Sequence, residues 1–342
     1  MAEPHHNVII GHGSAGNGAA TTLRERDPDC RITIINMGSL PFYNRYDLPR
    51  VFQDCDDWRD ILAHPPSYYD EQRITLRRNS RVVDVDGRAR TITFAHNEVM
   101  HYDRLLVCAG GRGYLPEELS DYRHLMHGFG SFEAAVSMRE ALSDGGTVIM
   151  LGGDMIGLDL ARTLVATGRR VVLVANDYTF WPHRVAADER DGHLHALTHM
   201  GIEVRDGAHP IAVEAVGESG SARRLVFEDG ATLEGDVVMP FYGLVPSVEF
   251  MLRSGVDIER GLLVDPWLRT TDENIWAAGD VCQIWSDEEK AYRFYYGWTN
   301  VRVMGEVVAR NVTGADETFA GIEDERLRVD EKGHIYSPFW EH

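Results

Sequence analysis

Two glycine-rich turns constrain the fold of this chain more than any other feature. The first spans Gly11 to Gly16 and reads GHGSAG; the second spans Gly152 to Gly157 and reads GGDMIG. Each follows a short apolar strand pattern, Val8 to Ile10 and Thr147 to Leu151, and each leads into a helical pattern. A second strand pattern comes after each helix. The chain is therefore predicted to be α/β, with two β-α-β units and parallel sheets.

The first turn carries the complete G-x-G-x-x-G pattern of a dinucleotide-binding unit. Gly11 permits the tight turn, Gly13 lets the backbone approach a pyrophosphate, and Gly16 lets the helix pack on the strand. The N-terminus of the helix, which begins near Ala15, would then face the phosphates. Asn36 replaces the acid usual after the second strand, and its amide can hydrogen-bond a ribose hydroxyl without charge assistance.

The second turn departs from the pattern at its middle position. The three motif positions are Gly152, Asp154 and Gly157, so an aspartate stands where backbone would meet a pyrophosphate. Two unit charges ~4 Å apart repel by about 4 kcal/mol at an effective dielectric constant near 20. That is roughly a thousandfold in affinity. A shifted register through Gly153 fails, because it needs a glycine at Leu151.

The strand after the second turn also lacks the acid that binds a ribose. It ends in Val174-Ala175-Asn176, and Asp177 is the nearest substitute. Two departures in one nucleotide site predict that NAD(P)H binding is weak or lost.

Charge and composition exclude several classes of function. Net charge at pH 7 is −20, which argues against nucleic acid and anionic membranes as partners and is compatible with a basic protein partner. No apolar run approaches the ~20 residues that span a bilayer, and the N-terminus carries no secretion signal. A cytoplasmic protein is predicted.

No disulfide, redox dithiol or metal site is predicted. Four cysteines are scattered without a C-x-x-C pair, at Cys30, Cys55, Cys108 and Cys282. Three histidines have a metal-like spacing, at His193, His195 and His199. No acid or cysteine completes that set, so a solvated helix surface is expected.

Five blocks of the chain, in this order, resemble the pyridine nucleotide–disulfide oxidoreductase superfamily of flavoprotein reductases. The resemblance is strongest to the ferredoxin and rubredoxin reductase branch and to the flavin module of nitrite reductases. The blocks are the Gly11 turn, Pro41 to Arg45 (P-Y-N-R in the family), Leu106 to Gly110 (L-x-A-T-G), Ile156 to Asp159 (I-G-L-E), and Leu268 to Asp280 (L-R-T-S-x-P-x-I-Y-A-A-G-D). The last block is the most specific.

The resemblance implies bound FAD and assigns its contacts. The residues carried over are Gly11, Gly13, Ser14, Ala15, Gly16, Asn36, Arg45, Val82, Ala109, Gly110, Gly279 and Asp280. Asn36 lies where the adenosine ribose is held, Arg45 near the adenosine half, and Val82 where main chain meets adenine. Asp280 would hold the ribityl chain or the adjoining phosphate.

Near the flavin the family places an aromatic residue and a lysine. The aromatic corresponds to Trp298, with Tyr295 and Tyr296 beside it, although plain core packing stays open for these three rings. Arg50 replaces the lysine and keeps a positive charge that cannot deprotonate. The helix after Trp298 would aim its positive N-terminus at the flavin and stabilise the anionic reduced form.

The order of the patterns predicts two Rossmann-like, three-layer ββα domains, the second inserted in the first. Residues 1–112 and 243–312 are assigned to the FAD-binding domain, and residues 113–242 to an NAD(P)-type domain. Residues 313–342 are expected to form a short tail in place of the dimerisation domain of the family. The face near the flavin would then be open to a partner.

These features predict an FAD-dependent oxidoreductase that passes electrons between its flavin and a redox protein, as a subunit of a hetero-oligomeric complex. The expected partner is an iron–sulfur protein or a metalloenzyme, because a flavin joins two-electron to one-electron chemistry. Two alternatives stay open. One is an NAD(P)H:acceptor reductase of the ferredoxin or rubredoxin type, in which Asp154 is tolerated. The other is a non-catalytic flavoprotein that serves as a scaffold or redox sensor.

Overall fold

The computed structural model describes residues 4–53, 55, 57–142, 144–183, 185–321, 327–329 and 335–336. It confirms the predicted α/β class, because each glycine turn joins a strand of a parallel sheet to a helix. The chain forms two compact units. The first holds residues 1–44, 62–112 and 245–323, and the second holds residues 45–61, 113–244 and 324–342. No helix in the described ranges is long and apolar enough to span a bilayer.

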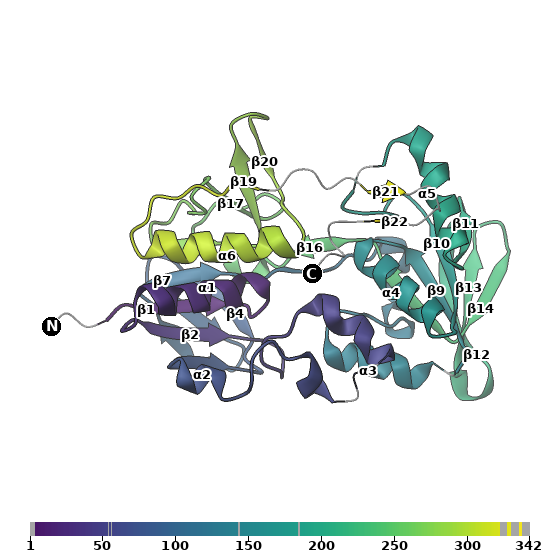
Figure 1. The fold of residues 1–342 in the computed structure, drawn as a ribbon, viewed down its shortest axis with the longest axis horizontal. Helices are drawn as coiled ribbons and strands as arrows, with labels where there is room; N and C mark the ends of the chain where they lie inside the picture. The colour runs from purple at the N-terminus through teal and green to yellow at the C-terminus, as the bar shows by residue number, and fades with distance from the viewer. Residues whose placement is uncertain are drawn as a thin grey trace. The chain divides into compact units, whose positions relative to one another are not determined.

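The first unit is built on a five-stranded parallel sheet in the order β18-β7-β1-β2-β3 (Figure 1). Its strands are β1 (His6–Ile10), β2 (Arg31–Ile35), β3 (Ile74–Arg77), β7 (Arg104–Val107) and β18 (Ile275–Ala277). All five residues of β1 are buried, as a central parallel strand covered on both faces requires. Two helices, α1 (Ser14–Arg26) and α6 (Trp298–Val312), lie side by side against this sheet (Figure 1).

Two smaller sheets complete the first unit, one antiparallel and one mixed, in which β17 and β19 are parallel. Their strands are β4 (Val82–Asp86), β5 (Thr91–Phe94) and β6 (Val99–His101) in one, and β17 (Leu262–Val264), β19 (Cys282–Ser286) and β20 (Ala291–Arg293) in the other. Val85, Ile92 and Phe94 join the core of the parallel sheet. Short helices are α2 (Tyr68–Glu71) and η5 (Glu249–Met251). The short strands β8 (Gly111–Gly113) and β16 (Leu244–Pro246) lie where the sequence passes between the units.

The close approach of α1 and α6 depends on small residues. A Cβ on Gly305 would lie 2.1 Å from the carbonyl oxygen of Ala15, so glycine alone fits at this crossing. The middle of α6 therefore packs directly against the start of α1.

The second unit contains the other parallel sheet, in the order β11-β10-β9-β15. Its strands are β9 (Thr147–Gly152), β10 (Arg170–Ala175), β11 (Glu203–Asp206) and β15 (Val237–Phe241). Its helices are α3 (Phe132–Ala141), α4 (Met155–Ala166) and α5 (Ala187–His199), with short turns η1 (Arg45–Phe52), η2 (Trp58–Ile61), η3 (Glu117–Leu125) and η4 (Glu218–Gly220). An antiparallel sheet adds β12 (Pro210–Val216), β13 (Ala222–Phe227) and β14 (Thr232–Gly235).

Residues 45–61 group with the second unit, although the sequence assigns them to the FAD-binding domain. The reason is their packing: Leu48, Val51 and Phe52 of η1 are buried. The Arg139 guanidinium on α3 donates to the carbonyl oxygens of Val51 (2.9 Å) and Cys55 (3.3 Å). Burial and these hydrogen bonds together hold the segment in the second unit, and the order of motifs in the sequence does not reveal them.

The predicted tail, 313–342, lies partly outside the described residues. Phe319 is buried in the core of the first unit, and the N–H of Phe319 donates to the carbonyl oxygen of Pro266 (2.8 Å). Two further strands, β21 (Arg328–Val329) and β22 (Ile335–Tyr336), pair antiparallel and group with the second unit.

Candidate functional site

The first glycine turn is shaped by two contacts that exclude any side chain. Gly11 has φ +106°, and a Cβ there would lie 2.0 Å from the carbonyl oxygen of Cys108. A Cβ on Gly16 would lie 2.1 Å from the carbonyl oxygen of Gly11. Both glycines therefore serve the close packing of β1, α1 and β7. Gly13 differs from them, since a Cβ at that position would meet nothing within 4 Å.

The N-terminus of α1 is open. Its N-cap is Gly13, which offers no side-chain oxygen, and no acid lies in the first turn of the helix. Within the described part of the chain, the N–H groups of Ser14, Ala15 and Gly16 have no acceptor. Unpaired N–H groups and the helix dipole together suit a phosphate. These residues therefore fit the FAD pyrophosphate that the resemblance assigns to them.

The residues assigned to the adenosine end are partly used by the protein itself. The Asn36 side-chain amide donates to the carbonyl oxygen of Leu40 (2.8 Å) and accepts from the N–H of Gly38 (3.1 Å). Asn36 thus closes its own loop, and one amide hydrogen and one lone pair are left for a ribose. Val82 begins β4 opposite Phe94. Both roles stay predictions.

Of the residues assigned to the flavin end, Gly279 lies beside α6, because a Cβ there would lie 3.3 Å from Val301. Asp280 is half-buried, and its charge acts on Tyr296 and Cys282, whose pKa values are raised mainly by burial and further by Asp280. Ala109 and Gly110 follow β7, and Gly110 has φ +62°. Gly279 has φ +85° and packs against Ala15, which places the turn before Asp280 beside α1.

The three aromatic residues beside α6 have different surroundings. Tyr295 packs edge-on against Phe319, as plain core packing predicts. Tyr296 stacks on Phe294 with ring centroids 5.4 Å apart. Trp298 borders a cavity of about 530 Å³ in the first unit, together with Ser14, Phe42 and His64. Trp298 is therefore the strongest of the three candidates for a contact with a bound ligand.

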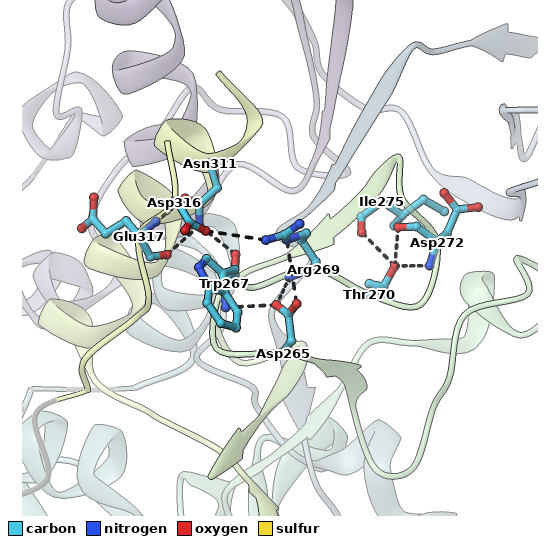
Figure 2. Close-up of polar contacts among 9 residues, drawn as sticks. All are labelled: Asp265, Trp267, Arg269, Thr270, Asp272, Ile275, Asn311, Asp316 and Glu317. Atoms are coloured by element: carbon cyan, nitrogen blue, oxygen red, sulfur yellow. Dashed lines mark hydrogen bonds and ion pairs between the residues drawn. The ribbon is translucent and has the colours of Figure 1, made fainter. Parts of the chain in front are cut away.

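A network of polar contacts holds the loop that leads to Asp280 (Figure 2). The carboxylate of Asp265 accepts from the N–H groups of Trp267 and Arg269, both at Oδ1 (3.0 and 2.9 Å). The Thr270 hydroxyl donates to the carbonyl oxygen of Ile275 (2.8 Å), and Asn311 of α6 donates to that of Trp267 (2.9 Å). Hydrogen bonds thus connect the segment around Leu268 to Asp280, the most specific block of the sequence, to both α6 and β18.

The second glycine turn also has its first glycine at positive φ, with Gly152 at +95°, and Asp154 stands in the place of Gly13. Asp154 is the N-cap of α4, and its Oδ1 accepts from the N–H of Gly157 (2.9 Å). Its Oδ2 accepts from the N–H of Gly243 (3.1 Å). The N–H of Met155 donates to the carbonyl oxygen of Trp181 (2.9 Å). The N–H groups of Met155 and Gly157 at the start of α4 therefore already have acceptors within the protein, whereas those at the start of α1 have none among the described residues.

This geometry corrects the electrostatic reasoning from sequence. That reasoning treats Asp154 as a charge facing a pyrophosphate, but the side chain is only 4% exposed and turns into the protein. Burial raises the pKa of Asp154 to about 6, and the N–H groups of Gly157, Gly243 and Ile156 oppose the rise. Its carboxylate thus occupies N–H groups at the start of α4 and in the loop at Gly243.

Gly152, Gly153 and Gly157 each meet the protein closely. A Cβ on Gly152 would lie 2.2 Å from the carbonyl oxygen of Phe241, and one on Gly157 would lie 2.5 Å from the Phe241 ring. Gly153 has φ +93°. These glycines are needed for the packing of α4 on β9 and β15.

The buried carboxyl of Asp154 predicts an unusual pH dependence of stability. Its folded pKa of about 6 exceeds the ordinary 3.8, so between these values the folded chain holds a proton that the unfolded chain has lost. The contribution of Asp154 to stability therefore falls as pH rises from about 4 to 6, by an amount on the order of 3 kcal/mol, and is constant above. Denaturant unfolding of the wild type and Asp154→Asn from pH 4 to 7.5 measures it. Parallel profiles would contradict the assignment.

Other predicted residues lie outside the first unit. Arg45 and Arg50 belong to η1 in the second unit, where Arg50 donates to the carbonyl oxygen of Asp60 (3.3 Å). Their roles toward FAD stay predictions.

The cysteines and His193 are packed inside the protein. All four cysteines are buried thiols that form no disulfide, and burial raises the pKa of Cys108 to about 12. The described residues contain no group of three potential metal ligands. His193 is buried against Phe180, with Nδ1 2.8 Å from the carbonyl oxygen of Glu189, so the expectation of a wholly solvated helix surface was wrong for this residue.

Sequence reasoning missed a cluster of rings around the first turn. His12, Phe42 and Tyr69 contact one another, and His64 stacks on Tyr68 with centroids 3.9 Å apart. The available signal was a histidine at the variable position of the glycine pattern, which the pattern itself does not constrain.

Known proteins resemble the chain over most of its length. The nitric oxide reductase FlRd-NAD(+) reductase of Enterobacter sp. (strain 638) is 27% identical over 281 residues, covering 82% of this chain and 73% of the relative. The ferredoxin--NAD(+) reductase component of the anthranilate 1,2-dioxygenase system of Burkholderia cepacia is 28% identical over 319 residues, covering 92% and 77%. Both names include NAD(+), which gives no support to the predicted loss of NAD(P)H binding.

A solved structure shares the fold. The ferredoxin reductase for the CYP199A2 system from Rhodopseudomonas palustris has a TM-score of 0.81 and 25% identity, and the match covers 96% of this chain and 80% of that one. The sequence profile of the family described as pyridine nucleotide-disulphide oxidoreductase matches residues 5–304. The chain therefore belongs to this family, as its motifs predict, and is an FAD-dependent oxidoreductase.

Proposed function

We propose that this chain is an NADH-dependent reductase that passes electrons through its flavin to a small iron–sulfur protein. The observation that carries the proposal is the family match over residues 5–304, which includes both glycine turns and both parallel sheets. Two of the relatives named above carry NAD(+) in their names, and two are ferredoxin reductases. This is the alternative that the sequence left open. It replaces the prediction that NAD(P)H binding is weak or lost.

The two units divide the work in this proposal. In the first unit the open start of α1 receives the pyrophosphate of FAD, and Asp280 and Trp298 border its reactive end. When bound, FAD supplies the conversion between two-electron and one-electron transfer. No side-chain acid or base is needed for that conversion, so the protein contributes binding, orientation and the exclusion of water.

The second unit favours NADH over NADPH. Asp177 follows β10 and is exposed, on a turn that Asn176 holds by accepting the N–H of Tyr178 (2.9 Å). A carboxylate in this position accepts ribose hydroxyls and repels a 2′-phosphate. The nearby Arg190 is bound bidentately by Asp206 (2.7 and 2.8 Å) and is not available to a phosphate.

Stopped-flow reduction of the flavin tests the donor. We expect NADH to reduce it with an apparent Kd at least tenfold lower than that of NADPH. Asp177→Asn should narrow this preference, because the charge that opposes the 2′-phosphate is removed. Asp229→Asn, a second exposed acid on a turn of the same unit, is the matched control and should leave the ratio unchanged.

The outcomes separate the candidate functions. A flavin that neither nucleotide reduces, but that a reduced iron–sulfur protein does reduce, would replace the proposal with an electron-transfer subunit. Slow reduction by every donor would favour the scaffold or sensor. Oxidation of the NADH-reduced flavin by a ferredoxin or rubredoxin would support the acceptor class.

A further inference from the structure

The variable position of the first glycine turn holds a buried histidine. His12 lies between Gly11 and Gly13, and the residue is 8% exposed. Burial, with a smaller contribution from His64, lowers the pKa of His12 to about 3. The imidazole is therefore neutral, and one ring nitrogen carries a hydrogen while the other is an acceptor.

Tyr69 decides which nitrogen carries that hydrogen. Its hydroxyl oxygen accepts from the N–H of Phe42 (3.2 Å) and lies 3.2 Å from Nε2 of His12. If the hydroxyl donates to Nε2, its hydrogen is used and Nδ1 of His12 carries the ring hydrogen. The reverse arrangement leaves the buried hydroxyl hydrogen without an acceptor. The first arrangement satisfies more of the buried groups.

The resulting Nδ1–H has no partner in the described part of the chain. A buried donor without an acceptor is costly, and such groups in folded proteins usually indicate a missing ligand or water. Nδ1 is bonded to the ring carbon that joins Cβ, so it lies close to the main chain of the turn. The open N–H groups of Ser14, Ala15 and Gly16 follow directly along that main chain.

We propose that the Nδ1–H of His12 donates a hydrogen bond to the pyrophosphate of bound FAD, with Tyr69 as the positioning residue that holds the required tautomer. The histidine adds a neutral side-chain donor to the backbone N–H groups of the turn. The chain thereby binds the phosphates without a positive charge in that turn, in a protein whose net charge is −20.

His64 shows that a ring in this cluster need not have this role. It stacks on Tyr68 at an interplanar angle of 10° and borders the cavity with Phe42. His64 lies outside the glycine turn, and we assign it no contact with the pyrophosphate.

Reconstitution of the apoprotein with FAD tests the proposal by the dissociation constant. His12→Gln moves the polar group away from the position of Nδ1 and should weaken FAD binding about 10- to 100-fold, the range for a hydrogen bond to a charged group. His12→Asn places an amide nitrogen near the position of Nδ1 and should restore most of the affinity. Tyr69→Phe should give an intermediate loss. His96→Asn, an exposed histidine paired with Glu98, is the control and should bind FAD normally.

Nitrogen NMR of histidine-labelled wild-type protein gives a readout that does not depend on the variants. We expect the His12 ring hydrogen on Nδ1 in the apoprotein, and its protection from exchange when FAD binds. A hydrogen on Nε2, or equal FAD affinity in the wild type and a folded His12→Gln, would overturn the proposal. Neither readout involves NADH, so failure here leaves the proposed donor untouched.

Discussion

Gly13→Asp should abolish tight FAD binding and leave the apoprotein folded. Gly13 has φ −90° and an extended ψ, and a Cβ at that position would meet nothing within 4 Å, so a side chain fits. The new carboxylate would lie at the helix N-terminus that the pyrophosphate needs, and two unit charges ~4 Å apart repel by about 4 kcal/mol at an effective dielectric constant near 20. It would also cap the N–H of Gly16, as Asp154 caps that of Gly157. We expect FAD affinity to fall at least hundredfold.

Two matched variants separate the causes of that loss. Gly13→Ala adds only a Cβ, and Gly13→Asn adds a cap without charge, so the dissociation constants should increase in the order Ala, Asn, Asp. The cap should stabilise the apoprotein of the Asp variant by about 1 kcal/mol. Equilibrium dialysis of FAD and thermal melting of the apoproteins measure both effects. An Asp variant that binds FAD within tenfold of the wild type would show that the phosphates lie elsewhere.

The sequence predicted the parts of the fold that local chemistry determines. The motif itself predicts the role of Gly11 and Gly16, because only glycine fits where the backbones of strand and helix touch. The alternation of apolar strands and helices likewise predicts two parallel sheets. The assignment of residues 45–61 could not be predicted in this way, because it depends on the contacts of Val51 with Arg139, far away in the sequence.

The directions of side chains could not be predicted from the sequence either. The sequence places Asp154 at the right position, but it does not show that the carboxylate turns inward onto Gly157 and Gly243. It also gives no sign that the amide of Asn36 closes its own loop. Both features depend on hydrogen bonds that form only once the turn has folded.

Asp154→Gly should tighten the binding of NADH, and this prediction rests on the start of α4 as the pyrophosphate site. In the wild type Asp154 accepts the N–H of Gly157 and competes with a phosphate for the helix N-terminus. Removing the carboxylate frees that N–H group and removes a buried charge, and glycine is the residue that the pattern requires there. Its φ of −64° is one that glycine adopts without strain. We expect the apparent Kd for NADH to fall at least tenfold.

The series Asp, Asn and Gly at position 154 then decides between charge and competition. An Asn variant that already binds NADH as tightly as the Gly variant assigns the effect to charge; an Asn variant that matches the wild type assigns it to the occupied N–H groups. The dependence of the flavin reduction rate on NADH concentration gives the apparent Kd for each protein. Equal values in all three would place the nucleotide away from α4. A lower Kd in the Gly variant would show that this chain holds its donor less tightly than its fold allows, by means of one buried carboxyl.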